Sequence, residues 1–250
     1  MSSKRNTEIL WPASCYPRAI TNEYPFLQYA PGPRALRGVL ARHMRAGISV
    51  LDIGCGMGIG ACHIAASGGR GVRYIGIDPD VAACRQGREI LAGLPPDSVR
   101  GQILERSLQE YLDTSPPPVD LILWAFAFHD CTNVADEPTH APLCAAVAAL
   151  LVPGGTLVVM DACFAPGVSD NEIERAYAYM ERLLGHSDRG RYFPPGTIAT
   201  LFTGTGLTLI EHQDVPLVAL ARYLDLPHAR AAVFVFVKRP NDGDVTPSGW

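Results

Sequence analysis

A glycine-rich turn between two apolar runs constrains the fold of this chain more than any other part of its sequence. The first run, 50–53, carries Asp52 and leads into glycines at 54, 56, 58 and 60, and the second run, 74–77, ends at Asp78. This arrangement predicts two buried parallel strands, the first of which turns into a helix. Ligands of an open α/β sheet bind beyond the carboxyl ends of its strands, so we expect an acid and a bare backbone where a nucleoside would lie.

The spacing of the glycines separates this turn from a dinucleotide-binding fingerprint. That fingerprint requires Gly-x-Gly-x-x-Gly, and the third position after Gly56 is Ile59 rather than glycine. Asp52, two residues before the first glycine, has no part in the fingerprint either. The turn therefore predicts a different ligand, with a tight strand–helix connection that binds nothing as the alternative.

The turn resembles motif I of the class I S-adenosylmethionine (SAM)-dependent methyltransferases, in the small-molecule type of that family. The resemblance implies SAM as the cofactor. It places the backbone of 54–56 at the amino-acid end of SAM, Asp52 near the methionine ammonium, and Asp78 on the two ribose hydroxyls. These residue types suit such contacts, because an ionised carboxylate makes strong hydrogen bonds to hydroxyl and ammonium donors, and glycine lets the backbone approach closely.

Two later segments extend the cofactor site that the resemblance implies. Ser107 and Leu108 fall where the family contacts adenine, although they can equally cap the short helix that follows. Trp124 begins the loop that runs beside the sulfonium, with core packing as an equal alternative. The full set of implied cofactor-binding residues is Asp52, Gly54, Cys55, Gly56, Asp78, Pro79, Ser107, Leu108, Trp124, Ala125 and Phe126.

Chemistry on the acceptor side is expected from His129 and Asp130, the base-like pair after the fourth strand. A histidine there takes the proton of an acceptor hydroxyl at neutral pH, and the alternative is a structural histidine oriented by neighbouring backbone. Asp161, at the end of the fifth strand, is expected to cap a helix or to face solvent. The candidate substrate-binding residues, with core or surface positions as their alternatives, are Trp11, Tyr24, Tyr29, Asn133 and Tyr177.

Hydrophobic periodicity predicts strands and helices that alternate along most of the chain. The predicted strands are 50–53, 74–78, 101–104, 119–124, 156–161, 207–210 and 232–237. The predicted helices are 34–44, 60–66, 81–91, 141–151 and 197–202. This alternation indicates a parallel sheet with right-handed crossovers. With the resemblance, it predicts an α/β Rossmann-like sheet of seven strands, mostly parallel with an antiparallel last strand, and helices on both faces.

The domain organisation that we predict is one SAM-binding domain over 1–240. Within it, 1–45 forms an N-terminal helical lid, and 164–196 is an insertion after strand five that begins with a capping box at Ser169 and Glu172. The segment 241–250 is rich in Pro, Gly and Asp and is predicted to be a flexible tail.

Composition argues against several classes of partner. The net charge of −4 gives no basic field for nucleic acid or an anionic membrane. The seven cysteines contain no Cys-x-x-Cys pair, which argues against a metal centre or a disulfide framework and favours the cytoplasm. The apolar stretch 144–159 is interrupted by Pro153, so it does not predict a membrane span. A small-molecule substrate is therefore expected, and the sequence leaves monomer and homodimer open.

Two functions remain for such a chain. The first is a methyltransferase acting on a small metabolite of specialised metabolism, by in-line displacement at the sulfonium. The alternative is an enzyme that cyclises SAM to azetidine-2-carboxylate and releases methylthioadenosine. Both use the same cofactor site, so the motif alone does not separate them. A binding subunit without activity is disfavoured, because the glycine turn and Asp78 are both intact.

Overall fold

The protein is built on one seven-stranded sheet, as seen in a computed structural model that describes residues 31–133, 140–164, 167–169, 171–172, 174–175, 193, 195–216 and 229–240. The strands are β1 Ser49–Ile53, β2 Val72–Asp78, β3 Val99–Glu105, β4 Val119–Ala125, β5 Leu151–Phe164, β6 Leu207–Pro216 and β7 Ala229–Lys238. The helices with bounds are α2 Pro31–His43, α3 Ile59–Ala66, α4 Val81–Ala92, α5 Leu108–Leu112, α6 Phe128–Asn133, α7 His140–Ala149 and α9 Pro195–Thr203.

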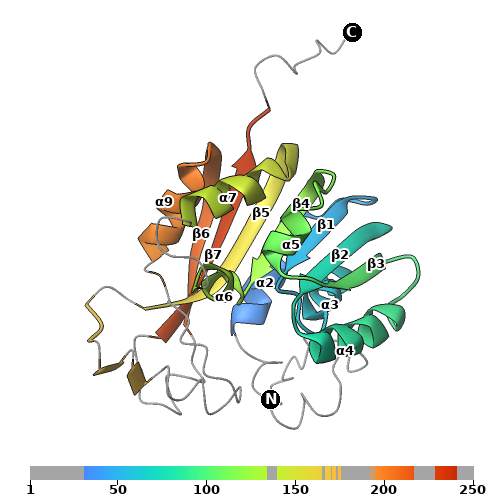
Figure 1. Ribbon diagram of the computed structural model, residues 1–250, viewed down its shortest axis with the longest axis horizontal. Helices are drawn as coiled ribbons and strands as arrows, with labels where there is room; N and C mark the ends of the chain where they lie inside the picture. The colour runs from blue at the N-terminus through green and yellow to red at the C-terminus, as the bar shows by residue number, and fades with distance from the viewer. Residues whose placement is uncertain are drawn as a thin grey trace, which may run out of the picture.

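The strand order, β3-β2-β1-β4-β5-β7-β6, explains how the site is positioned (Figure 1). Strands β1 to β5 pair in parallel, whereas β7 runs antiparallel to both of its neighbours, β5 and β6. The carboxyl ends of β1, β2, β4 and β5 therefore meet at one edge of the sheet. The predicted fold class is confirmed, including the antiparallel hairpin of the last two strands.

Helices cover both faces of the sheet, and each face has its own hydrophobic core (Figure 1). Alternate residues of β1 point to opposite faces: Val50 packs with α2, α3 and α4, and Leu51 with α5, α6, α7 and α9. Both residues are fully buried. A strand that is buried on both faces reads as a continuous apolar run, which is why Asp52 stands out in this one.

Two predicted boundaries need correction, and in both cases a proline lies inside a strand or helix that was predicted to begin after it. Pro153, Gly154 and Gly155 precede the predicted strand 156–161, but in the structure they lie inside β5. Val119 of β4 pairs with Leu151, and Leu121 pairs with Thr156, so three extra residues bulge out of the ladder. Proline has no N–H to contribute to the ladder and Gly154 has a φ of 77°, which together favour a bulge.

The second correction concerns Pro31, Gly32 and Pro33, which precede the predicted helix 34–44. These residues instead form the first turn of α2, where a missing N–H costs no intrahelical bond. The segment after β4 was expected as a loop, and its residues 128–133 form α6. The remaining predicted elements occur, with ends that shift by a few residues, and β5, β6 and β7 are longer than predicted.

Of the predicted insertion, only scattered residues belong to the described part of the chain. The capping box is confirmed: the Ser169 Oγ accepts from the N–H of Glu172 at 3.4 Å, and the N–H of Ser169 donates to Glu172 Oε2 at 3.3 Å. The lid residues 1–30, the helix face that includes Tyr177, and the tail 241–250 lie outside the described residues, so the predicted division of the domain stays a prediction.

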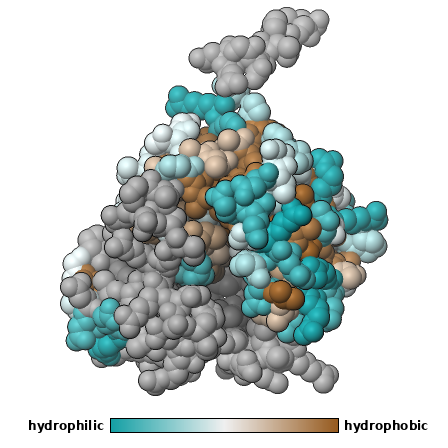
Figure 2. Space-filling view, in the orientation of Figure 1, coloured by the Kyte–Doolittle hydropathy of each residue, from teal (hydrophilic) through white to brown (hydrophobic). Residues whose placement is uncertain are grey.

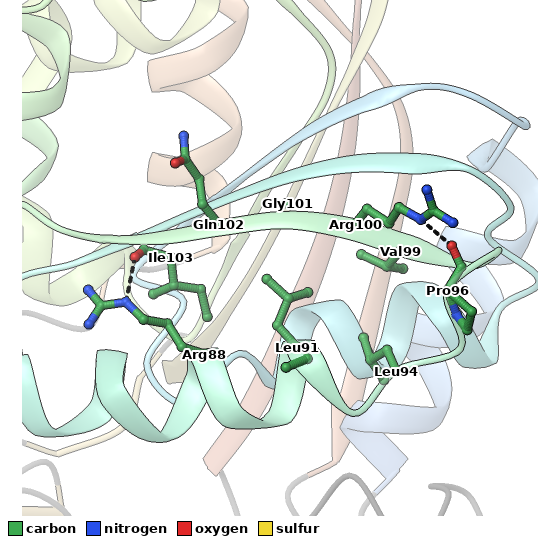
Figure 3. Close-up of a pocket in the computed structure, with 10 residues that line it drawn as sticks. Arg88, Leu91, Leu94, Pro96, Val99, Arg100, Gly101, Gln102 and Ile103 are labelled. Atoms are coloured by element: carbon green, nitrogen blue, oxygen red, sulfur yellow. Dashed lines mark hydrogen bonds between the residues drawn. The ribbon is translucent and has the colours of Figure 1, made fainter.

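The groove in Figure 3 lies away from the carboxyl ends of the central strands. Helix α4 and the turn after it lie along the edge strand β3, with Leu91 and Leu94 between them, and the guanidinium of Arg88 donates to the carbonyl of Ile103 at 3.0 Å. The groove between them has a volume of about 560 Å³. Because ligands of this fold class bind beyond the carboxyl ends of the strands, the groove is not the candidate site.

The visible surface is mostly polar, with small apolar patches between the charged side chains (Figure 2). Among the described residues, the large hydrophobic side chains left exposed are Val81, Phe126 and Ile210. In the same residues, no helix is long and apolar enough to cross a membrane. No group of three or more His, Cys, Asp or Glu side chains in this part of the chain is arranged to hold a metal ion.

Candidate active site

The glycine turn after β1 adopts a backbone that only glycine accepts readily. Gly54, Gly56 and Gly58 have φ values of 66°, 49° and 73°, in the left-handed region. A Cβ on Gly54 would overlap the Cβ of Ala127, whereas one on Gly56 would meet no atom within 4 Å. The N–H of Cys55 donates to the carbonyl of Ile77 at 3.0 Å, which fixes the turn against β2. The predicted turn therefore exists, and Gly56 faces open space.

Asp78 ends β2 directly beside this turn. Its Oδ2 accepts from the N–H of Gly56 at 2.8 Å, and its Oδ1 accepts from the N–H of Asp80 at 2.8 Å. Each carboxylate oxygen has further lone pairs for hydroxyl donors. Asp80 is the N-cap of α4 and accepts from two of its N–H groups, so the helix starts immediately after Pro79. Val81, the first residue of α4, is 62% exposed and offers an apolar surface next to Asp78.

Asp52 lies beneath the turn and is almost completely buried, with 3% of its surface exposed. Its Oδ2 accepts a hydrogen bond from the hydroxyl of Tyr74 at 2.5 Å. Burial raises the pKa of Asp52 to about 7, the negative charge of Asp78 adds to that rise, and the hydrogen bond from Tyr74 opposes it. The first turn of α3 passes so close that a Cβ on Gly60 would overlap the Asp52 carboxylate.

The two residues proposed to contact adenine begin α5. Ser107 is the N-cap, and its hydroxyl accepts from the N–H of Glu110 at 3.3 Å. The Glu110 carboxylate accepts in return from the N–H of Ser107 at 2.8 Å, which completes a capping box. Leu108 is buried in the core. The capping interpretation is thus confirmed, and an adenine contact by these residues stays a prediction.

Two aromatic residues at the end of β4, Trp124 within the strand and Phe126 just after it, lie in opposite environments. Trp124 is completely buried and packs edge-on against Phe128 and Phe202, with ring centroids 4.9 and 6.2 Å apart. Its side chain therefore packs in the core, as the alternative interpretation had it, and a cofactor contact by this residue stays a prediction. Ala125 is partly buried. Phe126 is 42% exposed and has a φ of 57°, a strained backbone for a bulky residue.

Strain of this kind persists only where surrounding structure holds it, and it is common at functional sites. The N–H of Phe126 donates to the carbonyl of Met160 on β5 at 2.6 Å, which ties the strained residue to the next strand. The sheet therefore presents an aromatic ring at its carboxyl edge at the expense of backbone strain. Sequence reasoning placed Phe126 at this edge but gave no sign of the strain.

His129 is fixed by the carboxylate of Asp161. The Nδ1 of His129 lies 2.7 Å from Asp161 Oδ1, and the backbone N–H of His129 donates to Oδ2 at 2.8 Å. An ionised carboxylate only accepts, so Nδ1 donates its proton to Asp161 and Nε2 lies on the other side of the ring. Nε2 lies 3.3 Å from Oδ1 of Asp130, whose side chain is 47% exposed. His129 and Asp130 therefore lie close together, as the sequence suggested, and their catalytic role stays a prediction.

Asp161 corrects the sequence prediction in part. It caps α6 by accepting from the N–H of His129, as one of the two expectations had it, but it is 1% exposed and does not face solvent. The histidine is held by this side chain as well as through its backbone. Asp161 also accepts from the N–H of Ala162 at 2.7 Å, so three donors among the described residues surround its carboxylate.

Two residues that shape the site were missed or misread from the sequence. Tyr74 was counted only as part of a buried strand, and Asp161 was not connected to His129. The remaining predicted substrate-binding residues, Trp11, Tyr24, Tyr29 and Tyr177, lie outside the described residues. Asn133 ends α6, and its side chain also lies outside them. The acceptor side of the site, including the catalytic roles of His129 and Asp130, therefore stays a prediction.

Comparison with known proteins agrees with the fold and the turn. Residues 51–157 match the family described as "Methyltransferase domain". No curated protein matches the whole sequence significantly. Among solved structures, the mycolic acid cyclopropane synthase CmaA1 complexed with SAH and CTAB is similar, with 13% identity, a TM-score of 0.64, and coverage of 82% of this chain and 84% of that one.

Two further solved structures are similar over comparable lengths. A SAM-dependent methyltransferase from Methanosarcina mazei has 16% identity and a TM-score of 0.60, and the match covers 81% of this chain and 98% of that one. The [4+2]-cyclase SpnF has 15% identity and a TM-score of 0.61, with coverage of 84% and 82%. At these identities the likeness shows the fold. The predicted resemblance is thus confirmed at the level of the fold: the chain has the fold of class I SAM-dependent methyltransferases, and residues 51–157 match the methyltransferase-domain family.

Proposed function

We propose that this protein is a SAM-dependent methyltransferase that acts on a small metabolite with an ionisable hydroxyl group. The observation that carries the proposal is the His129–Asp161 pair, because the Asp161 carboxylate orients an imidazole, the usual general base at neutral pH, at the carboxyl edge of the sheet. That edge is the one where the glycine turn and Asp78 provide acceptors and bare backbone. A base next to a cofactor site is what removal of an acceptor proton requires.

The residues of the turn fit the two polar ends of SAM. Asp78 keeps lone pairs for two ribose hydroxyls, and the backbone around Gly56 is unobstructed. Asp52 is a buried carboxylate with one protein donor among the described residues, so a cationic ammonium group would complete its surroundings. When bound, SAM supplies a methyl group activated by its sulfonium.

His129 would then act as the general base for the acceptor. Its Nε2 takes the hydroxyl proton as the oxygen forms its bond to the methyl carbon, and the pair of electrons of the broken S–CH₃ bond remains on sulfur. The imidazolium that results is stabilised by Asp161 at 2.7 Å. The products are the methyl ether, S-adenosylhomocysteine (SAH) and one proton, which His129 returns to solvent.

The acceptor that this edge favours has an apolar surface. Phe126, three residues before His129 in the sequence, is an exposed aromatic residue, and apolar walls with few polar groups are typical of small-molecule sites. The predicted contacts from Trp11, Tyr24, Tyr29, Asn133 and Tyr177 belong to this proposal. Specialised metabolism and a cytoplasmic location are parts of it as well, as is the absence of a nucleic-acid or membrane partner.

Cyclisation of SAM is the competing reaction, and the fold does not decide between the two because one fold hosts many chemistries. The structural neighbour SpnF, for instance, is described as a [4+2]-cyclase. Asp52 supports transfer over cyclisation. A carboxylate beside the α-amine holds that amine as an ammonium, and an ammonium has no lone pair with which to attack carbon.

The test is mass spectrometry of the purified protein incubated with SAM, first alone and then with a panel of phenols and alcohols. We expect intact SAM in the first sample and SAH plus a methylated acceptor in the second. The matched control is Asp78→Ala, which leaves His129 and Asp161 in place. Methylthioadenosine with azetidine-2-carboxylate in the sample without acceptor would overturn transfer in favour of cyclisation.

A further inference from the structure

Tyr74 and Asp52 form a buried pair that the proposed chemistry does not use directly. Tyr74 is 1% exposed and Asp52 is 3% exposed, and they lie on neighbouring strands, β2 and β1. The phenol donates to Asp52 Oδ2, while Oδ1 has no recorded protein donor among the described residues. The Tyr74 hydroxyl therefore has a specific partner, which a tyrosine that only fills space in the core does not require.

The local packing shows why the hydroxyl reaches that oxygen. In the parallel register, Tyr74 lies opposite Val50, and Asp52 lies opposite Gly76. A Cβ on Gly76 would come within 3.1 Å of the Tyr74 ring and 2.7 Å of Cys55 Sγ, so the missing side chain makes room for both groups. The Tyr74 ring therefore lies beneath the turn, and its hydroxyl ends on the carboxylate.

Within the part of the chain that the structure describes, the groups that act on Asp52 are acids and weak acids, with no cation among them. From β2 it faces Tyr74 and Asp78, and from the turn it faces Cys55, whose thiol pKa is raised by burial. From α3 the Gly60 backbone lies against the carboxylate, and Cys62 is near the phenol. From β4 the neighbour is the side chain of Leu123, which does not titrate. A ligand cation would be the first positive charge at this position.

We propose that Tyr74 is a positioning residue for the amino-acid end of the cofactor, and that binding of that end displaces a proton from Asp52. The Tyr74 hydroxyl holds Oδ2, which leaves Oδ1 as the oxygen that receives the ligand ammonium. This inference rests on the proposed use of SAM and goes beyond it, because it links cofactor affinity to pH through one buried pair.

The direction of the pH dependence follows from the state of Asp52 before binding. Burial raises the pKa of Asp52 to about 7, so the free protein carries the group partly protonated at neutral pH. An ammonium beside it favours the ionised form and lowers that pKa in the complex. Binding therefore releases about half a proton at pH 7, and affinity falls by about eightfold from pH 7.5 to pH 6.

Calorimetry with SAH tests this without any turnover. SAH carries the ammonium but no sulfonium charge, so it brings no new positive charge toward His129. Titrations in buffers of different ionisation enthalpy at one pH give the number of protons released. The control ligand is methylthioadenosine, which has the nucleoside and sulfur but lacks the amino-acid end. We expect proton release and pH-dependent affinity for SAH, and neither for methylthioadenosine.

Two variants separate positioning from a structural role. Tyr74→Phe removes the hydroxyl that stabilises the ionised form, so SAH affinity at pH 7 should fall by about tenfold and its pH profile should shift to higher pH. Methylthioadenosine affinity should stay within about twofold of wild type. Asp52→Asn should abolish proton release altogether. If Tyr74→Phe weakened both ligands equally, Tyr74 would be a structural residue only and the inference would be overturned.

The outcomes also distinguish this inference from the proposed function. Absence of SAH binding at every pH would reject the SAM site itself. Tight SAH binding without proton release, and with a flat pH profile between pH 6 and 7.5, would leave the SAM site intact and overturn the role of Tyr74 and Asp52. Circular dichroism of each variant at the same pH values identifies any loss that comes from unfolding.

Discussion

Two carboxylates lie buried at the same edge of the sheet, and their surroundings differ. Asp161 accepts from three donors, the imidazole and backbone N–H of His129 and the N–H of Ala162. Asp52 accepts from the hydroxyl of Tyr74, and no second donor to it is recorded in the described part of the chain. Both side chains are no more than 3% exposed. Similar burial therefore coexists with unequal hydrogen bonding.

The difference separates two uses of a buried anion. A carboxylate with several donors is stabilised by the protein itself and can fix the position of a neighbour. A carboxylate with one neutral donor pays for its burial, and the result is a pKa near 7 for Asp52. We interpret Asp161 as a carboxylate that orients His129, and Asp52 as a group whose charge is neutralised by a ligand. Exchanging either one for asparagine tests this contrast.

The largest effect is expected from Asp161→Asn. The amide cannot offer two acceptor oxygens to His129, so the favoured tautomer of the imidazole is lost. Turnover should fall by about a thousandfold or more, as in other acid–base pairs of this kind. Steady-state kinetics with the acceptor found above measures it. SAH affinity should be nearly unchanged, and an equal loss of affinity would show that Asp161 only maintains the fold of the site.

The stability effect of Asp52→Asn comes next, and its sign is opposite to that of most buried substitutions. The folded-state pKa of Asp52 is about 7, above its ordinary value of 3.8. The folded state therefore binds more protons between these values, and wild-type stability relative to the variant falls as pH rises from about 4 to about 7. At pH 7 the ligand-free variant should be more stable by up to about 4 kcal/mol.

Urea unfolding of both proteins at pH 4.5 and pH 7 measures this difference, because contributions from all other groups cancel in the comparison. A stability difference that is the same at both pH values would contradict the raised pKa. It would also place Asp52 in the same class as Asp161.

Asp78 is intermediate between the two, since it accepts from two backbone N–H groups at the turn. Asp78→Ala should weaken SAH binding by about 1.5–3 kcal/mol, because it removes charge-assisted hydrogen bonds to the ribose hydroxyls. The same loss should appear for methylthioadenosine, which carries the same ribose. Calorimetry that finds unchanged affinity for both ligands would reject the assignment of Asp78.

A smaller effect is expected at Phe126, which lies on the Asp161 side of the site. Phe126→Gly relieves a left-handed backbone and should raise the free energy of unfolding by about 1 kcal/mol, less the cost of the lost ring contacts. Turnover should fall while SAH affinity is retained. Chemical denaturation and kinetics of the same preparation check the two effects. Loss of stability with full activity would mean that the exposed ring has no part in the site.

The smallest effect is expected from Ser107→Ala, which removes a helix cap that neither carboxylate touches. The loss of the Glu110 contact should cost about 1 kcal/mol of stability. Thermal unfolding measures this loss, and SAH titration shows whether Ser107 has a second role. A drop in SAH affinity beyond about twofold would support the adenine contact that the sequence suggested.

The sequence predicted the local geometry of the turn and strand end better than the long-range pairs of side chains, for a physical reason. Gly54, Gly56 and Asp78 could be read directly, because a left-handed turn and an acid at a strand end are local requirements. The bonds from Tyr74 to Asp52 and from Asp161 to His129 join residues 22 and 32 positions apart. Such pairs depend on strand order and register, which periodicity does not supply.

Trp124 shows a second feature that the sequence does not determine, which is the direction in which a side chain at a strand end points. Its position at the end of a strand suggested a pocket wall, yet its side chain turns into the core between Phe128 and Phe202. A fully buried strand carries large residues on both faces, so an aromatic residue at its end has no sequence signal for its direction. The exposed Phe126, two positions later, depends on a strained φ that no sequence pattern announced.

The central claim is that SAM lies across the ends of β1 and β2 with its reactive sulfur toward His129. A crystal structure of the protein with SAH tests it most directly. The account predicts both ribose hydroxyls on Asp78, the ammonium on Asp52 Oδ1, and the sulfur on the side of His129 and Phe126. An SAH molecule bound elsewhere on the sheet, or one whose ammonium points away from Asp52, would contradict it.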